Sequence, residues 1–285
     1  MNNGNCSYNE LLNQTNTYDI FSLPGICNEM RLLNNKAHIL IEKEGSKKIN
    51  FIKIYKKDFY IENKLCEQDM LTIKHPNLVN LNDVRENDKY KIFEYKYHNT
   101  FDLYSCITNT SIYNIIKDNN NLDKLSEQLI NVINYLHINN ICHRDIKIDN
   151  ILVHFHNDFK IMLCDFEFIA HTDSDGYNLD KSVNFRMGTT EYMGPELYSG
   201  LNINWKKVDI WNIGIVLCIV YSNILPGNIK INESSMYYKS WDRYHNERFF
   251  KKNNLKDRDL NIIMNFMDPI PSNRSSLDNY IEYYK

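Results

Sequence analysis

The sequence predicts an α+β protein of two lobes, a small β-rich lobe followed by a larger α-helical lobe. Three observations predict this class: β-type alternation up to residue 95, helical spacing from residue 97 onward, and enough chain for two lobes that share a cleft. The chain has 285 residues and 43% of them are hydrophobic, so it can bury a substantial core. We therefore expect one globular unit built from two lobes.

The strands of the small lobe come first. Apolar residues alternate over 39–41 and 49–55, on either side of the turn sequence EKEGSKK, which predicts a hairpin that leads into a third strand. Residues 60–74 (YIENKLCEQDMLTIK) have helical spacing and predict a helix. Two further strands are expected at 78–84 and 90–95.

Helical patterns fill the rest of the chain. Residues 125–139 (LSEQLINVINYLHIN) predict one helix, and 210–221 (IWNIGIVLCIVY) are the most apolar segment. That segment is shorter than the ~18 to 20 residues that cross a bilayer, so we expect a buried helix and no membrane partner. The Asn-rich residues 1–18 lack the basic and apolar regions of a secretory signal, and we expect a flexible N-terminal arm there.

Charge and cysteine usage narrow the function classes. Lysine and arginine number 33 against 36 aspartates and glutamates, so the net charge of −3 gives no global field that would recruit nucleic acid or an anionic membrane. Seven cysteines without a CxxC pair favour a reduced, intracellular compartment. We expect a cytoplasmic location, in the host cytoplasm if the protein is viral, with the nucleus left open. The oligomeric state has no signal in the sequence.

The chemistry concentrates in residues 143–150 (HRDIKIDN). Asp145 is a base candidate, Lys147 can neutralise a phosphate, and the Asn150 amide can bind a metal ion. Phosphoryl transfer needs little covalent help, because the catalyst mainly positions the reactants and neutralises charge. The loop resembles HRDLxxxN, the catalytic loop of the eukaryotic protein kinase family.

The resemblance covers roughly residues 30–284 and implies the bilobal protein kinase fold. Its expected boundaries are a kinase domain at 19–285, with the N-lobe at about 19–95, the hinge at about 94–99 and the C-lobe at about 99–285. The lysine at position 147 and the segment GTTEYMGPE resemble the serine/threonine branch. The implied activity is transfer of the γ-phosphate of ATP to Ser/Thr hydroxyls of a protein substrate, with Mg²⁺.

The resemblance assigns roles to individual residues. Asp145 would accept or orient the substrate hydroxyl, Lys147 would stabilise the transferring group, and Asn150 with Asp165 of IMLCDFEF would bind magnesium. The sequence NFIKIYKK resembles VAIK and places the phosphate-binding lysine at Lys53. Glu67 is the expected partner of that lysine, and the spacing leaves Glu62 as an alternative.

An ATP pocket follows from the same resemblance. Phe93 would be the gatekeeper behind the adenine, while Glu94 and Lys96 would offer backbone groups to the purine. The residues expected to bind ATP are Lys53, Ala37, Ile39, Phe51, Phe93, Glu94, Lys96 and Leu152.

Scaffold and regulatory residues are implied too. Glu196 is expected to pair with Arg274, and the helix that carries Asp209 is expected to anchor the catalytic loop. Arg144 would tie a phosphorylated activation segment to the loop. Ser182 is the hypothesised phosphorylation site, with Thr172 and Thr190 as further candidates.

The sequence departs from the family at three places. The glycine-rich loop is replaced, with Leu32, Asn34 and Ala37 at its glycine positions when counted back from Ile39. Glu167 stands where DFG has glycine, and Phe51 stands where VAIK has alanine. These changes leave a pseudokinase, acting as a binding module, as the alternative function. A small-molecule kinase of the aminoglycoside or choline type is a third possibility that shares the fold.

Overall fold

The structure is a computed structural model that describes residues 36–43, 48–62, 65–96, 100–155, 158–179, 188–199, 202–223 and 255–281. The expected arm at 1–18, the loop positions Leu32 and Asn34, and Ser182 lie outside the described residues, as do the side chains of Glu62, Ala37 and Ile39. The chain folds into two compact units, and each is described by itself. The smaller comprises Met1–Lys74 and Val79–Asn99, and the larger His75–Leu78 and Thr100–Lys285.

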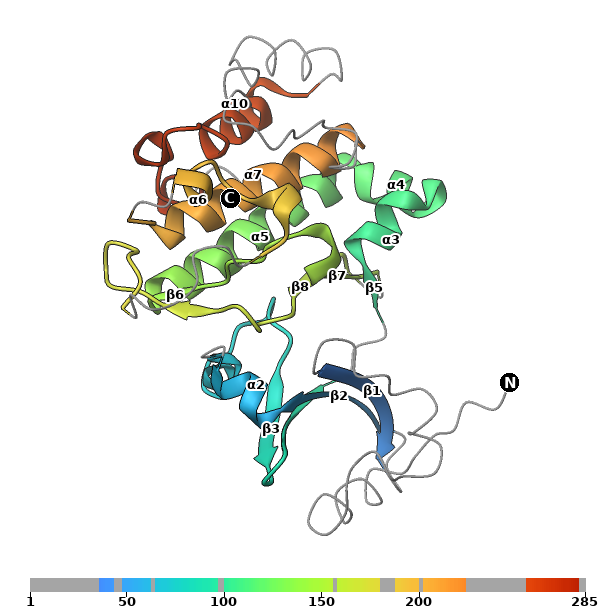
Figure 1. The fold of residues 1–285 in the computed structure, drawn as a ribbon. Coiled ribbons are helices and arrows are strands. Elements are labelled where there is room, and N and C mark those ends of the chain that lie inside the picture. Colours follow the sequence, from blue (N-terminus) through green and yellow to red (C-terminus); the bar gives the residue numbers. More distant parts are fainter. Residues whose placement is uncertain are drawn as a thin grey trace. The chain divides into compact units, whose positions relative to one another are not determined.

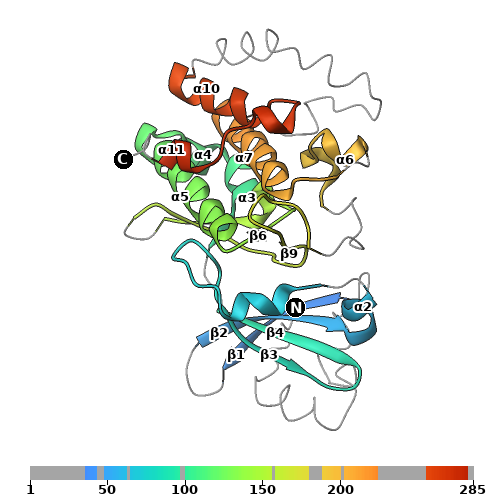
Figure 2. The same ribbon diagram turned by 90° about the vertical axis from the view of Figure 1, so that its left-hand side faces the viewer.

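The smaller unit is built on a four-stranded antiparallel sheet (Figure 2). Its strands are β1 (Lys36–Lys43), β2 (Lys48–Lys56), β3 (Leu81–Glu86) and β4 (Tyr90–Lys96), in the order β1-β2-β4-β3. The hairpin predicted around EKEGSKK is confirmed, because β1 and β2 pair antiparallel with Lys43 opposite Lys48. Alternation buries Ile52 and Ile54 on one face of β2 and Lys53 and Tyr55 on the other.

The helix predicted over residues 60–74 is wrong. The chain instead forms a short α-helix, α2 (Lys57–Glu62), and a separate 3₁₀ helix, η2 (Glu67–Leu71). The reason lies in the burial pattern of η2, where Glu67 and Met70 are buried while Gln68 and Leu71 are exposed. Residues three apart share a face in a 3₁₀ helix, so this tighter winding points both buried side chains inward.

The larger unit is mainly helical (Figure 1). Its first three helices run in quick succession, and each starts at a side-chain cap. They are α3 (Leu103–Thr108), α4 (Thr110–Lys117) and α5 (Asn119–Ile138), capped by Asp102, Asn109 and Asp118. The expected helix at 125–139 is therefore part of a longer one that begins at Asn119 and ends at Ile138.

The predicted apolar helix is the centre of this unit. α7 (Trp205–Ser222) is buried on all sides over Val208–Val220, contacts α5, and begins at an Asn204 cap. No helix in the described residues is both long enough and apolar enough to cross a membrane. The other α-helices in the described part of this unit are α6 (Glu196–Ser199), α10 (Asp257–Phe266) and α11 (Asp278–Ile281).

Short strands frame the segments that carry the expected chemistry. One sheet contains β5 (Phe101–Asp102), β7 (Ile151–His154) and β8 (Lys160–Leu163), and a second pairs β6 (Ile141–Cys142) with β9 (Ala170–His171). The loop at 143–150 therefore leaves β6 and ends through a 3₁₀ turn, η3 (Ile148–Asn150), in β7. Residues 164–169 connect β8 to β9, so both segments are fixed at each end.

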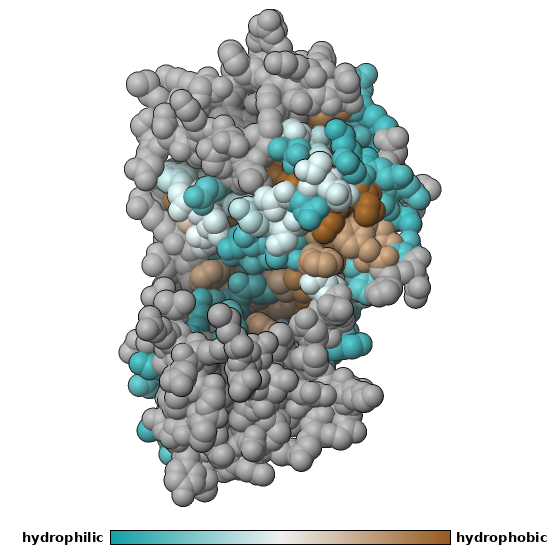
Figure 3. All heavy atoms as spheres, turned by 90° about the vertical axis from the view of Figure 1, so that its right-hand side faces the viewer, coloured by the Kyte–Doolittle hydropathy of each residue, from teal (hydrophilic) through white to brown (hydrophobic). Residues whose placement is uncertain are grey.

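Hydrophobic and hydrophilic atoms lie side by side on one face of the larger unit (Figure 3). Large hydrophobic side chains exposed on this unit include Phe101, Tyr104 and Ile115. Scattered exposed hydrophobics are usual on folded proteins and indicate no site by themselves.

Candidate active site

The base of the 143–150 loop is held by a buried aspartate of α7. Both carboxylate oxygens of Asp209 accept backbone N–H groups of the loop, from His143 and from Arg144, each at 2.8 Å. The Nε2 atom of His137 on α5 lies 3.0 Å from the same carboxylate. Asp209 is fully buried, and its two acceptor oxygens fix the backbone one residue before Asp145. The expectation that this helix anchors the loop is confirmed.

Asp145 is surrounded by donors. Its Oδ1 accepts the backbone N–H and the hydroxyl of Thr189, both at 2.8 Å. Its Oδ2 accepts the Asn150 amide at 3.1 Å and lies 3.1 Å from Nζ of Lys147. The carboxylate is buried, so these donors compensate its lost hydration and set its direction.

Lys147 and Thr189 close a triangle with Asp145. The ammonium of Lys147 donates to the Thr189 hydroxyl at 2.8 Å, and that hydroxyl donates to Asp145. The neighbouring Gly188 has a φ of +109°, and a Cβ there would lie 2.8 Å from the carbonyl oxygen of Arg144. A glycine is therefore required where the segment passes close to the loop backbone.

Two oxygen-bearing side chains could hold a divalent cation. The amide nitrogen of Asn150 donates to the carbonyl of Asp145 at 2.8 Å, which leaves its amide oxygen as a ligand atom. The carbonyl of Asn150 accepts the Cys164 N–H at 3.0 Å, so the loop is tied to the residue that precedes Asp165. An amide oxygen and a carboxylate form the hard oxygen set that magnesium prefers, so these residues fit Mg²⁺.

The backbone of the segment DFE (165–167) accommodates a glutamate at the position where the family has glycine. Asp165 adopts a left-handed backbone, with a φ of +63°, whereas Glu167 does not have a positive φ. The Glu167 side chain is buried, and Phe166 is fully buried with its ring edge-on to His143, 5.6 Å between centroids. His143 Nε2 lies 3.1 Å from the Cys164 carbonyl. The glycine of DFG is therefore replaced at a position whose backbone does not need glycine here.

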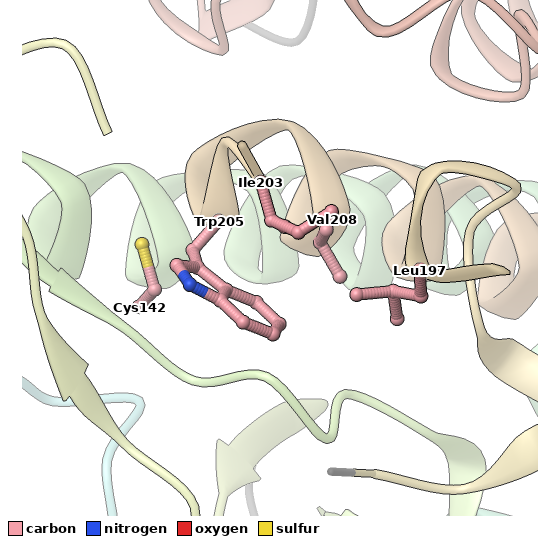
Figure 4. Packing of buried hydrophobic residues seen from close by; sticks show 5 residues of the cluster. All are labelled: Cys142, Leu197, Ile203, Trp205 and Val208. Atoms are coloured by element: carbon pink, nitrogen blue, oxygen red, sulfur yellow. The ribbon is translucent and has the colours of Figure 1, made fainter. Parts of the chain in front are cut away.

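Arg144 is already engaged within the larger unit. Its guanidinium donates to the carbonyls of Phe168 and Ile169 and lies over the Trp205 indole, 5.0 Å from the ring centroid. Figure 4 shows the same indole beside Cys142, in a hydrophobic cluster that continues through Ile203, Val208 and Leu197. The arginine is thus buried against an aromatic face and used to fix the start of β9.

The smaller unit contains the predicted lysine and its acid. Nζ of Lys53 lies 3.0 Å from Oε1 of Glu67, and both side chains are buried. The Glu67 carboxylate also accepts the hydroxyls of Tyr55, at 2.6 Å, and Tyr95. The structure therefore pairs Lys53 with Glu67, and the carboxylate is held by three donors.

Aromatic rings accompany Lys53 on β2 and β4. The Phe51 ring lies 5.3 Å from the His38 ring and 6.3 Å from the Tyr95 ring, between centroids. The strand register places His38 opposite Lys53 and Ile39 opposite Ile52. Because partners across a ladder share a face, this register supports His38 as the β1 residue on the lysine face.

That register also bears on the expected nucleotide contacts of β1. Ala37 pairs with Ile54 and Ile39 with Ile52, one step out of phase with Lys53. Neither ATP-binding prediction gains support from the register.

The remaining predicted pocket residues lie on β4 and β7. Phe93 is fully buried opposite Lys53, as a gatekeeper would be, and its ring is edge-on to Tyr55 at 5.5 Å. The N–H of Lys96 donates to the Asn80 carbonyl at 3.0 Å. A purine that accepted a hydrogen bond from this N–H would therefore compete with the Asn80 carbonyl. Glu94 pairs with Ile52 on β2. Leu152 is half-buried on β7, in the larger unit.

The expected scaffold pair is present. Arg274 is buried and makes two hydrogen bonds to Glu196, at 2.6 and 2.9 Å, while its Nη1 also donates to the Lys207 carbonyl. Sequence reasoning missed the two tyrosines on Glu67 and the tryptophan under Arg144. The spacing of Tyr55 two residues after Lys53 on one strand was a usable signal for the first, because it places both on the same face.

Comparisons with known proteins agree on one family. Residues 36–283 match the family described as "Protein kinase domain". "CBL-interacting protein kinase 31" of Oryza sativa subsp. japonica is 28% identical over 253 residues, which are 81% of this chain and 50% of the relative. "CBL-interacting serine/threonine-protein kinase 15" of Arabidopsis thaliana is 24% identical over 245 residues, 81% of this chain and 53% of the relative. The chain spans about half the length of these curated relatives.

A solved structure supports the fold. The "Crystal structure of Rad53 1-466 in complex with AMP-PNP" matches this chain with a TM-score of 0.63 at 20% sequence identity. The match covers 87% of this chain and 60% of that one. The predicted α+β class, with a sheet-based N-terminal part and a helical C-terminal part, is confirmed.

Proposed function

The chain belongs to the protein kinase family, in its serine/threonine branch, and from this premise we propose that it is an active protein kinase that transfers the γ-phosphoryl group of ATP to serine or threonine hydroxyls. The observation that carries the proposal is the buried carboxylate of Asp145, held by Thr189, Asn150 and Lys147. All of these groups donate to the carboxylate, so its oxygens are oriented as acceptors.

Asp145 would act on the acceptor hydroxyl. The Thr189 hydroxyl already donates to Oδ1 of Asp145, which indicates that an alcohol fits beside this oxygen. A substrate serine in an equivalent position would be oriented by the carboxylate and would give up its proton to it. Lys147, at 3.1 Å from Oδ2, would place a positive charge beside the transferring group.

The smaller unit would supply a lysine for the nucleotide phosphates, and the larger unit would supply ligands for the cation. Lys53, fixed by Glu67, would bind phosphate oxygens, because a buried ammonium with an acid partner remains charged and directed. Asn150 and Asp165 would hold Mg²⁺. When bound, the metal ion would neutralise charge on the phosphates.

A pseudokinase is the alternative. The ring of Phe51 favours it, because it stands where VAIK has alanine and is flanked on the lysine face by the rings of His38 and Tyr95. A small-molecule kinase has less support, because Lys147 and the GTTEYMGPE segment resemble enzymes that act on proteins. The retained ion pair and the intact donor set around Asp145 support the active enzyme.

The test is Mg²⁺-dependent transfer of labelled γ-phosphate from ATP to a degenerate library of serine and threonine peptides. Wild type should label the library, and Asp145→Asn should not. The matched control is Asp149→Asn, which changes an exposed acid of the same loop and should keep wild-type transfer. Absence of transfer by wild type, together with no thermal shift on adding MgATP, would favour the pseudokinase.

Substrate and location are further parts of the proposal. The substrate would be a protein, and the compartment intracellular and cytoplasmic. The five cysteines of the described residues form no disulfide: Cys66, Cys106, Cys142, Cys164 and Cys218. That state fits a reducing compartment. Cysteine-directed mass tagging of protein from its native source, without reductant, would test it.

A further inference from the structure

The acid that pairs with Lys53 also accepts the hydroxyls of two tyrosines, Tyr55 and Tyr95. We infer that the hydroxyls of Tyr55 and Tyr95 are positioning groups that keep Glu67, and through it Lys53, fixed for nucleotide phosphates. The inference rests on the proposed function and deepens it. It concerns only the smaller unit, in which all four residues lie.

The geometry gives each hydroxyl a separate task. Oε2 of Glu67 accepts the Tyr55 hydroxyl at 2.6 Å, while Oε1 accepts both the Tyr95 hydroxyl and the ammonium of Lys53, the latter at 3.0 Å. Both carboxylate oxygens are therefore bound by strands of the sheet, Tyr55 on β2 and Tyr95 on β4. Two anchors at opposite ends of a carboxylate fix its rotation, which one anchor cannot do.

The local backbone explains why such anchors are needed. Glu67 is the first residue of η2, a 3₁₀ helix of five residues, and the Cys66 side chain does not cap it. α2 ends at Glu62, so the acid is not carried in the interior of an α-helix. A short 3₁₀ turn has weak hydrogen-bond geometry and positions a side chain poorly by itself. Side-chain bonds to the sheet supply the missing constraint.

The charge balance also favours tyrosine. Glu67 is fully buried, and burying a carboxylate is costly unless its lone pairs are satisfied. A second cation would satisfy them but would weaken the hold of Glu67 on Lys53. A neutral hydroxyl donates a hydrogen bond without adding charge, so the Lys53 ammonium stays the single positive group among the three donors.

Removal of each hydroxyl is the direct experiment. Tyr55→Phe and Tyr95→Phe keep the rings, including the Tyr95 contact with Phe51. Each should raise the KM for ATP about tenfold, which equals about 1.4 kcal/mol and is typical of a hydrogen bond to a charged group. The double variant should raise KM further, with a smaller effect on kcat at saturating ATP. An unchanged KM in both single variants would overturn the inference.

Tyr113→Phe is the matched control. Tyr113 is also buried and also donates from its hydroxyl, to the Val220 carbonyl at 2.9 Å, but it packs between helices of the larger unit. Its variant should lower the melting temperature about as much as the other two, with KM for ATP unchanged. If it raises KM equally, loss of stability explains the effect and the positioning role is wrong.

A mutant cycle with Glu67→Gln separates this inference from the proposed function. In the Glu67→Gln background, Tyr95→Phe should change KM by less than about twofold, because its route to Lys53 is already broken. If wild type proves inactive, the proposed function fails, and the same cycle is measured by urea unfolding. Non-additive unfolding free energies would then still support the hydroxyl anchors, and additive ones would refute them.

Discussion

Two buried carboxylates, Glu67 of the smaller unit and Asp145 of the larger unit, are held in different ways. Glu67 is fixed by side chains, an ammonium and two phenols of one sheet. Asp145 is fixed by a backbone N–H, an amide, a hydroxyl and an ammonium that come from two loops. The donors to Glu67 lie on two strands of one sheet, whereas the donors to Asp145 lie on two loops and include a backbone N–H.

The difference predicts which substitutions would release each carboxylate. The loop of Asp145 relies on Asp209 beneath it and on Gly188 beside it, which are both scaffold features. Glu67 of the smaller unit can be released by removing one hydroxyl, that of Tyr55 on β2 or that of Tyr95 on β4. We therefore expect substitutions in the larger unit to affect chemistry or folding, and substitutions around Glu67 to affect nucleotide affinity.

The largest expected effect distinguishes loss of Asp145 from loss of Lys53 by turnover and by ATP binding. Asp145→Asn should lower kcat by about 10³-fold, the range for loss of a general base, while MgATP still stabilises the protein in thermal shift. Lys53→Met should instead abolish the thermal shift as well. Retained turnover in Asp145→Asn would contradict the role of Asp145 in catalysis, and a retained thermal shift in Lys53→Met would contradict the role of Lys53 in nucleotide binding.

The next largest effect is expected from loss of Asp209, which anchors the 143–150 loop. Asp209→Ala leaves two buried backbone N–H groups and His137 without their acceptor, so we expect the free energy of unfolding to fall by about 3 kcal/mol. The control is Asp158→Ala, which removes an exposed ion pair with Lys124 and should leave the free energy of unfolding nearly unchanged. Equal losses in urea melts would contradict the anchor role.

A smaller effect tests the hydroxyl beside Asp145. Thr189→Val removes a hydrogen bond to the carboxylate and an acceptor of Lys147, and should lower kcat about tenfold with little change in KM for ATP. Thr189→Ser should restore it. Thr190→Val, at the exposed neighbour, should have wild-type kinetics. If kcat of Thr189→Val equals that of wild type, the hydrogen bonds among Asp145, Lys147 and Thr189 have no part in turnover.

The smallest effect concerns Glu167. Because its backbone does not need glycine, Glu167→Gly should not improve KM for ATP by more than about twofold, and added chain entropy should cost about 1 kcal/mol of stability. A large gain in ATP affinity, measured by titration calorimetry, would mean that the glutamate weakens the nucleotide site after all.

Much of the fold could be predicted because its signals are local. The continuous apolar run at 210–221 falls within α7, and the alternation around EKEGSKK became the β1–β2 hairpin. The helix at 60–74 failed because apolar spacing does not distinguish an α-helix from a 3₁₀ turn. Leu71 is exposed although it is apolar, and within η2 the buried pair Glu67 and Met70 follows the three-residue repeat.

The site was predictable where a motif fixes the residue and not where neighbours decide its role. Lys53, Asp145 and Asn150 follow from motifs. The role of Arg144 does not, because a phosphate-binding role and a cation–π contact with Trp205 look alike in sequence. The hydroxyls on Glu67 were missed for a similar reason, since a tyrosine in a strand indicates core packing first.

The most direct test of the central claim is the MgATP affinity of wild type, Lys53→Met and Asp165→Asn, measured by titration calorimetry with and without Mg²⁺. If Lys53 binds nucleotide phosphates and Asp165 binds the magnesium ion, Lys53→Met should weaken binding under both conditions, and Asp165→Asn should remove the gain that Mg²⁺ gives wild type. Undiminished Mg²⁺ dependence in Asp165→Asn, or unchanged affinity in Lys53→Met, would contradict the account.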